Sequence, residues 1–331
     1  MPNYIVPLEH NETLKATIII PYRDYDQRLN SLLTQLKTQT NGHAEIILIN
    51  DFAITFFSYE VNPIIKPINL KDKSPHLNSS KNNKKEAIST GIMEASHEYI
   101  ICLDADITLT DSWWKTIARF ILDKKPHFAA GLHRYLPSDG WLNKFLVLEQ
   151  DILTATSIAA LNLRFPTMCN GANMIFTKTA FRAVKGYDGL YNTNGGDDLF
   201  LYHRIYKKFP YSTHYIKNLD ATVYSDPPET FFELLKQRRR WISKTTSYEN
   251  KSIQIQGGII FLTNFLFVSG LFIFPLLPII VLKFLTDILF IYKIKQFYGF
   301  KLSLLKTIIY SCLYPFYTVS VFVYYISKFR P

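Results

Sequence analysis

Two aspartates one residue apart, Asp104 and Asp106, directly follow an apolar segment over residues 99–103. That segment is typical of a buried strand, so the acids come at the point where the chain leaves the core. In an extended chain, residues two apart point to the same side. Their carboxylate oxygens suit Mg²⁺ or Mn²⁺, which also bind substrate phosphates. The pair therefore indicates a divalent metal site, whereas a solvated turn or a helix-capping pair is the alternative that involves no ligand.

Two other apolar segments also end in polar residues. Asp51 follows residues 45–49, and a carboxylate there can accept hydrogen bonds from a nucleobase N–H or a ribose hydroxyl. Pro21, Tyr22 and Arg23 end another segment, where Tyr22 can stack on a base and Arg23 can contact phosphate. The carboxyl ends of parallel strands meet at one edge of an α/β sheet, where such sheets bind ligands. We therefore predict a nucleotide site there, although a plain strand-end turn also accounts for Asp51.

Two adjacent acids, Asp197 and Asp198, begin a predicted helix over residues 197–208. The interpretation without a catalytic role is that they complement the helix dipole. The functional interpretation makes one of them a general base that takes the proton from an acceptor hydroxyl. A helix N-terminus weakens a carboxylate as a base, so burial or the neighbouring acid has to offset that effect.

Gln237, Arg240 and Trp241 are spaced i, i+3 and i+4 in a predicted helix over residues 230–246, so they share one face. Arg240 can make a bidentate contact with a diphosphate, and the flat ring of Trp241 can support a sugar. The alternative is an amphipathic helix at a membrane surface whose arginines contact lipid headgroups. Arg238 and Arg239, on other faces of the helix, can serve in that way alone.

The overall composition narrows the class of protein. With 331 residues, 48% hydrophobic and 15% aromatic, the chain is not intrinsically disordered. Its net charge of +10 is compatible with nucleic acid, anionic lipid or a phosphorylated substrate as partner. The densest basic stretch, residues 236–244, comes just before a long apolar run, which favours the cytoplasmic surface of a membrane. Nothing resembles a nucleic-acid-binding module, so we expect no nucleic-acid partner.

The absence of certain motifs from the sequence argues against several types of site. The sequence has no Gly-x-Gly-x-x-Gly after its first strand and no Gly-Lys-Ser/Thr phosphate loop, which argues against dinucleotide dehydrogenases and P-loop ATPases. A nucleotide must then be held by side chains and a metal. The three cysteines have neither metal-ligand spacing nor the even number of a disulfide framework, which indicates a reducing compartment.

The elements that position these residues alternate along the first half of the chain. Strands are predicted over residues 17–20, 45–49 and 99–103, with helices over 29–36, 87–95 and 113–121 between and after them. Residues 52–83 are polar and predict a short strand and a loop. The second half is less regular, with helices over 141–163, 178–184, 197–208 and 230–246 and a strand over 173–177. The pattern predicts an α/β fold with a Rossmann-like, mostly parallel sheet flanked by helices.

The C-terminal region has the composition of membrane helices. Residues 257–282 carry no charge, and this uncharged stretch is longer than the ~20 residues that a helix needs to span a bilayer. Residues 302–326 are a second candidate. Two spans place the basic loop over 293–301 outside, against the positive-inside tendency, whereas three return it to the cytoplasm. In the three-helix arrangement the chain turns at Phe274-Pro275, and Lys283 can pair with Asp287. We favour three helices over two, and a re-entrant or interfacial second segment is the further alternative.

In this order, the motifs resemble those of the family-2 glycosyltransferases, which have the GT-A fold, over residues 16–246. The matching residues are Ile18 to Pro21, Asp51, Lys85, Ala87, Gly91, Ala95, Leu103 to Asp106, Gly171-Ala172-Asn173, Phe181, Gly186-Tyr187-Asp188, Asp197-Asp198, Gln237, Arg240 and Trp241. Two departures are that Gly-Gly-Asp-Asp replaces the more usual Glu-Asp form and that Asn50 stands where many members carry a second Asp.

The resemblance implies a role for each matching position. It makes Asp198 the catalytic base and Asp104 and Asp106 the ligands of Mg²⁺ or Mn²⁺. The residues implied to bind the nucleotide are Pro21, Tyr22, Arg23, Asp51, Lys85 and Asp104. Those implied to bind the acceptor or the diphosphate are Gly171, Ala172, Asn173, Asp197, Gln237, Arg240 and Trp241.

The implied activity is that of an inverting glycosyltransferase. It moves a sugar from a nucleotide diphosphate sugar, by resemblance a UDP-sugar, to a hydroxyl of a membrane-proximal saccharide or lipid-linked acceptor. Processive members have more membrane helices and a gating segment, so we expect one or a few additions. A transferase with a polyprenyl phosphate acceptor and a catalytically dead, membrane-anchored nucleotide-sugar-binding protein are the alternatives.

The expected organisation follows from these elements. Residues 1–250 form a cytoplasmic GT-A domain, with a nucleotide-binding half over about 14–130 and an acceptor half over about 131–250. Residues 257–331 form a membrane region of two or three transmembrane helices. The N-terminal residues do not resemble a signal peptide, so we expect the N-terminal domain to stay in the cytoplasm. Together with the apolar segments, this predicts a multi-pass protein of the inner (cytoplasmic) membrane, in contact with membrane lipids.

Overall fold

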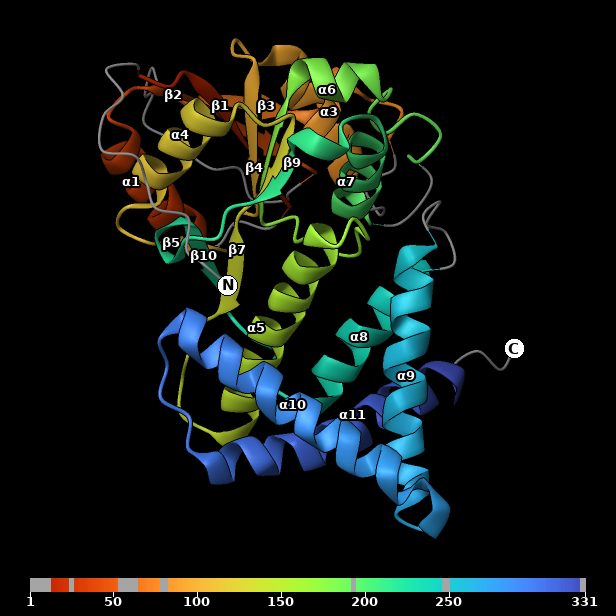
Figure 1. The fold of residues 1–331 in the computed structure, drawn as a ribbon. Helices are drawn as coiled ribbons and strands as arrows, with labels where there is room; N and C mark the ends of the chain where they lie inside the picture. Colours follow the sequence, from red (N-terminus) through yellow and green to blue (C-terminus); the bar gives the residue numbers. More distant parts are fainter. Residues whose placement is uncertain are drawn as a thin grey trace. The chain divides into compact units, whose positions relative to one another are not determined.

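The computed structural model describes residues 13–23, 27–52, 65–77, 83–191, 195–245 and 251–327. These residues fall into two compact units (Figure 1). The first, which we call the sheet unit, is drawn from residues 3–136 and 168–226. The second, the helical unit, is drawn mainly from residues 137–167 and 227–331.

A mostly parallel sheet forms the centre of the sheet unit. Within the described residues it has seven strands in the order β3-β2-β1-β4-β8-β6-β9. They are β1 (Ala16–Tyr22), β2 (Ala44–Asn50), β3 (Ile65–Asn69), β4 (Tyr99–Leu103), β6 (Phe128–Ala130), β8 (Asn173–Thr177) and β9 (Thr213–Tyr215). In this sheet β8 runs antiparallel to its neighbours β4 and β6, and the other pairs described for it are parallel. The predicted α/β fold class is confirmed.

The central strands β1, β2 and β4 are buried on both faces, which is why they read as continuous apolar runs rather than as alternating ones. Parallel pairing brings their carboxyl ends to one edge. Tyr22 at the end of β1 lies opposite Asn50 at the end of β2. The backbone N–H of Asp51 donates to the Tyr22 carbonyl at 2.8 Å, which extends this contact past the strand end.

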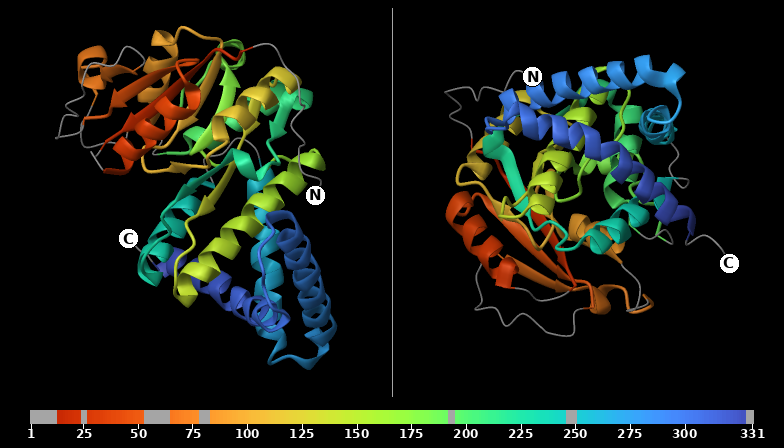
Figure 2. Two further views of the ribbon diagram at one scale, coloured as in Figure 1. Left: turned by 90° about the vertical axis from the view of Figure 1, so that its left-hand side faces the viewer. Right: turned by 90° about the horizontal axis from the view of Figure 1, so that it is seen from below.

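Helices cover both faces of the sheet (Figures 1 and 2). On one face lie α1 (Gln27–Thr40) and α4 (Trp113–Lys124), which contact each other and bury leucine and aromatic side chains against β1, β2 and β4. The other face carries α3 (Lys84–Glu94), α6 (Lys178–Ala183) and α7 (Asp197–Lys208). Gly91 lets α3 approach closely, because a Cβ there would lie 2.8 Å from side-chain atoms of Ile19 and Ile49.

A second, three-stranded sheet was not predicted. It consists of β5 (Thr108–Leu109), β10 (Thr222–Ser225) and β7 (Leu132–Tyr135), with β10 in the middle. Two short 3-10 turns precede strands in this part of the chain. Pro210–Ser212 lies directly before β9, and Leu219–Ala221 lies directly before β10. In the predicted irregular stretch over 52–83, the structure describes β3 and the short helix α2 (Leu70–Lys73). The loop predicted there falls largely on residues 53–64 and 78–82, outside the described residues.

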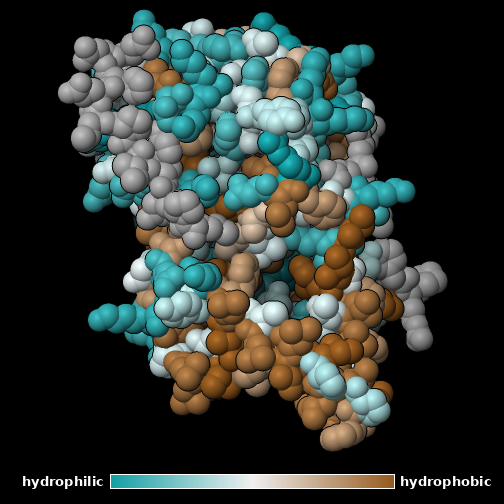
Figure 3. Space-filling view, viewed as in Figure 1, coloured by the Kyte–Doolittle hydropathy of each residue, from teal (hydrophilic) through white to brown (hydrophobic). Residues whose placement is uncertain are grey.

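The helical unit contains α5 (Trp141–Asn162), α8 (Phe231–Thr245), α9 (Ser252–Gly270), α10 (Leu277–Tyr298) and α11 (Leu304–Ser327). Three described segments are long and apolar enough to cross a membrane: Ser252–Gly270, Phe274–Tyr298 and Leu304–Ser327. The turn Phe274–Leu276 separates the first two at the predicted Phe274-Pro275 position, and Lys283 pairs with Asp287. Figure 3 shows hydrophobic side chains gathered on the surface of this unit, as a lipid-facing bundle requires. The functional division near residue 250 stays a prediction.

Candidate active site

The edge formed by the carboxyl ends of β1, β2 and β4 carries the first group of predicted residues. Asp51 is buried, and its two carboxylate oxygens accept from the backbone N–H and the side-chain Nδ2 of Asn83, at 3.1 and 3.0 Å. Arg23 Nη1 lies 4.0 Å from Asp51 Oδ2. Asn83 directly precedes α3, so Asp51 ties the end of β2 to the start of that helix. Its contact with a base or ribose stays a prediction.

The other nucleotide candidates at this edge differ in exposure. Pro21 is half-buried, and the Arg23 side chain is about one-third exposed. Tyr22 is buried and packs into the main hydrophobic core, so its ring offers little surface on which a base can stack. Stacking on Tyr22 stays a prediction that this burial does not favour.

Lys84 is the residue that sequence reasoning missed. Its Nζ lies 2.6 Å from Asp104 Oδ1 and 3.2 Å from Asp197 Oδ2, so one ammonium group joins two acidic clusters far apart in the sequence. Burial acts to lower the pKa of Lys84, but the negative charges of Asp104 and Asp197 outweigh it and raise that pKa well above its ordinary value. The amine is therefore a fixed positive charge between the clusters.

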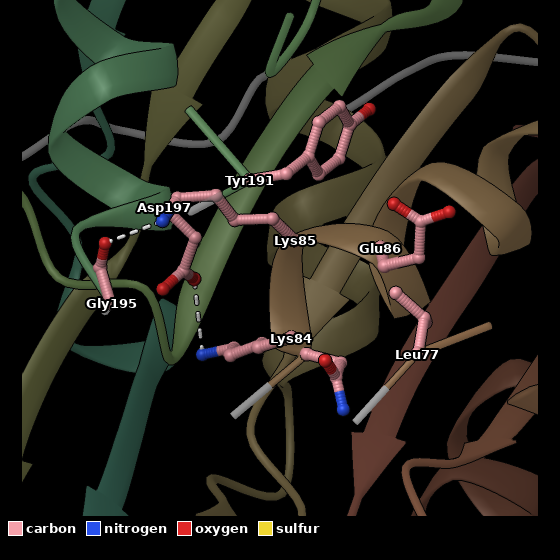
Figure 4. A pocket seen from close by; sticks show the side chains of 8 residues that line it. Leu77, Lys84, Lys85, Glu86, Tyr191, Gly195 and Asp197 are labelled. Atoms are coloured by element: carbon pink, nitrogen blue, oxygen red, sulfur yellow. Dashed lines mark hydrogen bonds and ion pairs between the residues drawn. The ribbon is translucent and has the colours of Figure 1, made fainter. Parts of the chain in front are cut away.

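Sequence reasoning assigned nucleotide binding to the neighbouring Lys85. In the structure the Lys85 amine turns elsewhere: it donates to the Gly195 carbonyl at 2.7 Å and lies 5.6 Å from the centroid of the Phe200 ring (Figure 4). Both lysines begin α3, and successive residues of a helix point in different directions. No pattern in the sequence distinguishes which lysine faces the acids.

Asp104 and Asp106 have the chemistry of a divalent metal site. The Asp104 side chain is about one-third exposed, and Asp106 is exposed. Partial desolvation by its surroundings and repulsion from Asp104 raise the pKa of Asp106, and a shared cation relieves such repulsion. The described residues contain no group of three or more His, Cys, Asp and Glu side chains suited to a metal. Two carboxylates suit Mg²⁺ or Mn²⁺, which take their remaining ligands from phosphates and water.

The acid pair at the start of α7 divides into a buried and a more accessible member. Asp197 is buried, and although burial acts to raise its pKa, the positive charge of Lys84 dominates and lowers it. Asp198 is half-buried, and its Oδ1 accepts from the Leu199 backbone N–H at 2.8 Å. Asp197 is thus part of the Lys84 network, whereas Asp198 retains surface through which it can meet a substrate.

Gly171 of the Gly-Ala-Asn segment lies beside these acids. A Cβ at Gly171 would lie 3.2 Å from Asp198 Cβ and 3.5 Å from Asp198 Oδ2, so the glycine leaves room beside the carboxylate. Ala172 is buried, and its N–H donates to the Asn170 side chain at 2.8 Å.

Asn173 is placed differently from what its predicted role requires. It has no exposed surface, and its Nδ2 donates to the backbone carbonyls of Ala221 and Leu132 at 2.9 and 3.3 Å. Its amide therefore joins the start of β8 to β7 of the small sheet and to the 3-10 turn that precedes β10. A contact of this side chain with an acceptor stays a prediction that the geometry does not favour.

A pocket beside the acids connects several of these groups. Figure 4 shows the Lys84 amine directed at the Asp197 carboxylate and the Lys85 amine at Gly195. Asn83, which holds Asp51, also lines it, so the pocket lies between the nucleotide candidate and the acidic clusters. Its lining residues are Leu77, Asn83, Lys84, Lys85, Glu86, Tyr191, Gly195 and Asp197.

Gln237, Arg240 and Trp241 lie on α8 in the helical unit. Arg240 is exposed, and Gln237 and Trp241 are half-buried. The prediction that Arg238 contacts lipid headgroups alone is wrong. Arg238 is 5% exposed and pairs with Glu149 of α5 at 2.7 Å, because its partner is a buried carboxylate that the local sequence does not reveal.

Two sequence relatives and one solved structure show what this chain is similar to. The poly-beta-1,6-N-acetyl-D-glucosamine synthase of Staphylococcus epidermidis is 25% identical over 249 residues, which cover 72% of this chain and 56% of that protein. The beta-1,4-mannosyltransferase egh of Drosophila melanogaster is 23% identical over 150 residues, 44% of this chain and 32% of that protein. The chain thus spans about half, or less, of the length of these curated relatives.

The mannosyltransferase PcManGT of Pyrobaculum calidifontis, solved in complex with GDP-Man and Mn²⁺, shares the fold. The two structures align with a TM-score of 0.55 at 12% sequence identity, and the alignment covers 97% of this chain and 89% of that chain. Together with the sheet order described above, this likeness supports the GT-A fold. The family model described as glycosyl transferase family group 2 matches residues 99–327, more than half of the sequence. The chain belongs to glycosyl transferase family group 2.

Proposed function

We propose that this protein is an inverting glycosyltransferase that moves a sugar from a nucleoside diphosphate sugar, a UDP-sugar in the first instance, to a hydroxyl group. The acceptor is a saccharide close to the membrane or one linked to a lipid. The observation that carries the proposal is the position of Lys84, 2.6 Å from Asp104 and 3.2 Å from Asp197. Lys84 thereby contacts both an acid that is proposed to hold the donor and an acid of the pair that is proposed to activate the acceptor.

On the donor side, Asp51 and Arg23 are proposed to contact the nucleoside and Asp104 and Asp106 to hold a divalent cation. Mg²⁺ or Mn²⁺ bound there would neutralise part of the diphosphate charge. The mannosyltransferase PcManGT, which shares the fold, was solved in complex with GDP-Man and Mn²⁺, and this supports a nucleotide-sugar donor and a divalent ion in the proposal. Lys84 adds a positive charge at the same place.

On the acceptor side, Asp198 is proposed as the general base. It takes the proton of the acceptor hydroxyl while the hydroxyl oxygen forms a bond to the anomeric carbon. The bond from that carbon to the diphosphate oxygen breaks, and the electron pair leaves with the nucleoside diphosphate. A single displacement of this kind inverts the anomeric centre. Asp197, which the positive charge of Lys84 keeps ionised, is the neighbouring acid of that base.

The remaining assignments are part of the same proposal. Gln237, Arg240 and Trp241 are assigned to the diphosphate and the acceptor on the strength of the family motif. The three apolar helices support attachment to a membrane, for which we propose the inner membrane with the catalytic residues in the cytoplasm. The basic residues that precede α9 agree with that orientation.

The proposal is tested with purified, detergent-solubilised protein and a panel of UDP- and GDP-sugars in the presence of Mn²⁺. We expect one or a few donors to release nucleoside diphosphate. Products that partition into organic solvent only when polyprenyl phosphate is supplied would instead identify that acceptor. Binding of a nucleotide sugar without any release under all conditions would identify a catalytically inactive binding protein.

A further inference from the structure

Arg238 lies at the centre of a buried polar network in the helical unit, between α5, α8 and α11 (labelled in Figure 1). Its Nη2 is 2.7 Å from Glu149 Oε2, and its Nε donates to the Tyr317 hydroxyl at 2.9 Å. Its Nη1 donates to Gln237 Oε1 at 2.8 Å, and the guanidinium carbon lies 4.0 Å from the centroid of a Trp241 ring. One side chain thus contacts both half-buried residues of the Gln-x-x-Arg-Trp motif.

These contacts fix how the two motif side chains are presented. Because Arg238 donates to Gln237 Oε1, the amide is held with its Nε2 donors directed away from Arg238. Because the guanidinium covers one face of the Trp241 ring, the other face is the one that remains for a ligand. Lysine cannot replace this function, since only a planar guanidinium can stack on a ring and serve several acceptors in fixed directions.

Stability alone does not account for the network. The side chains of Arg238 and Glu149 are 7% and 3% exposed, so both charges are removed from water. The desolvation penalty of such a pair often matches or exceeds its Coulombic gain, and apolar residues of similar volume commonly stabilise a fold equally well. A buried pair that also orients two neighbouring side chains therefore has a second reason to be present.

We propose that Arg238 is a positioning residue, which holds Gln237 and Trp241 in the orientation needed for sugar transfer and is itself held by Glu149 and Tyr317. The inference rests on the proposed function. It makes α11, one of the candidate membrane spans, a support for this part of the helical unit through a single hydroxyl group.

The test replaces the pair by apolar residues, Glu149→Leu with Arg238→Met, which removes both charges together. We expect the midpoint of thermal unfolding to stay within about 3 °C of the parent, because no buried charge is left unpaired. The kcat for nucleoside diphosphate release, from the nucleotide sugar that the panel identifies, is expected to fall about tenfold or more. The KM for that donor should change less than about threefold, since a lost orienting contact acts mainly on kcat. The neighbouring Arg239→Lys is the matched control and should retain the parental kcat.

A second measurement does not depend on activity. The chain has four tryptophans, so labelling with 5-fluorotryptophan gives four ¹⁹F NMR resonances, and Trp241→Phe identifies the one from Trp241. We expect that resonance to shift or broaden in the double variant and in Arg238→Lys, which keeps the charge and serves should the double variant not accumulate. An unchanged Trp241 resonance, or a stable double variant with parental kcat, would overturn the positioning role. If the parent releases no nucleotide from any donor, the proposed function fails, and the NMR measurement still decides the role of Arg238.

Discussion

Replacement of Lys84 by methionine removes the positive charge between Asp104 and Asp197 and keeps an unbranched side chain only one atom shorter. At an effective dielectric constant of about 20, contacts of 2.6 and 3.2 Å are each worth about 5–6 kcal/mol before desolvation is subtracted. Loss of one partner of a buried ion pair typically costs about 3–5 kcal/mol. Since the Asp104 side chain is about one-third exposed, solvent screening reduces that cost, and we expect a loss of about 2–3 kcal/mol.

The assay is thermal unfolding in detergent, with Lys73→Met as the matched control. Lys73 pairs with Glu94 at 2.7 Å on the surface, where such a pair contributes at most about 1 kcal/mol. We expect Lys84→Met to lower the unfolding midpoint by about 5–10 °C and the control by no more than about 3 °C. Mn²⁺ with UDP should recover part of the loss, because a cation at Asp104 replaces part of the missing charge. Equal midpoints for the two variants would refute the bridging role of Lys84.

Three further predictions concern the metal, the glycine beside the acids and a buried histidine. EDTA should stop nucleotide release and Mg²⁺ or Mn²⁺ should restore it; full activity after chelation would contradict the divalent site. Gly171→Ala should reduce kcat about tenfold or more with little change in unfolding midpoint, since its Cβ would lie 3.2 Å from Asp198 Cβ; an unchanged kcat would show that the carboxylate does not need that space. Burial lowers the pKa of His133 from 6.5 to about 4, so the unfolded chain binds its proton first as pH falls. Stability from this group is therefore complete above pH 6.5 and lost between pH 6.5 and 4, by about 3 kcal/mol; the pH dependence of unfolding should weaken by that amount in His133→Gln, and identical profiles would argue against it.

The long elements of the fold could be predicted because their residues repeat one pattern over many positions. The strand over 173–177 and the helix over 197–208 have the predicted bounds. The break between the first two apolar helices was signalled by Pro275, which does not donate an N–H to a continuing helix. The small sheet could not be predicted, because β5, β7 and β10 are only two to four residues long and show no alternation.

The candidate site shows where sequence reasoning stops. The positions of Pro21, Asp51 and Asp104 at the ends of apolar segments were enough to predict that they lie at one edge of the sheet, because parallel strands end together. The choice between Lys84 and Lys85 depended on the rotation of α3 about its axis. The buried state of Arg238 depended on Glu149, which lies far away in the sequence. In both cases the deciding partner is a long-range contact that leaves no local pattern.

We propose above that Asp198 activates the acceptor at a site that binds a nucleotide sugar. This proposal is tested most directly by comparing the parent with Asp198→Asn in one preparation, with calorimetric titration of the donor and with sugar transfer or nucleotide release measured side by side. The substitution keeps the size of the side chain and an oxygen that can accept from the Leu199 N–H. We predict that donor affinity persists within about threefold while turnover falls by at least about a hundredfold. Parental turnover in Asp198→Asn would contradict it.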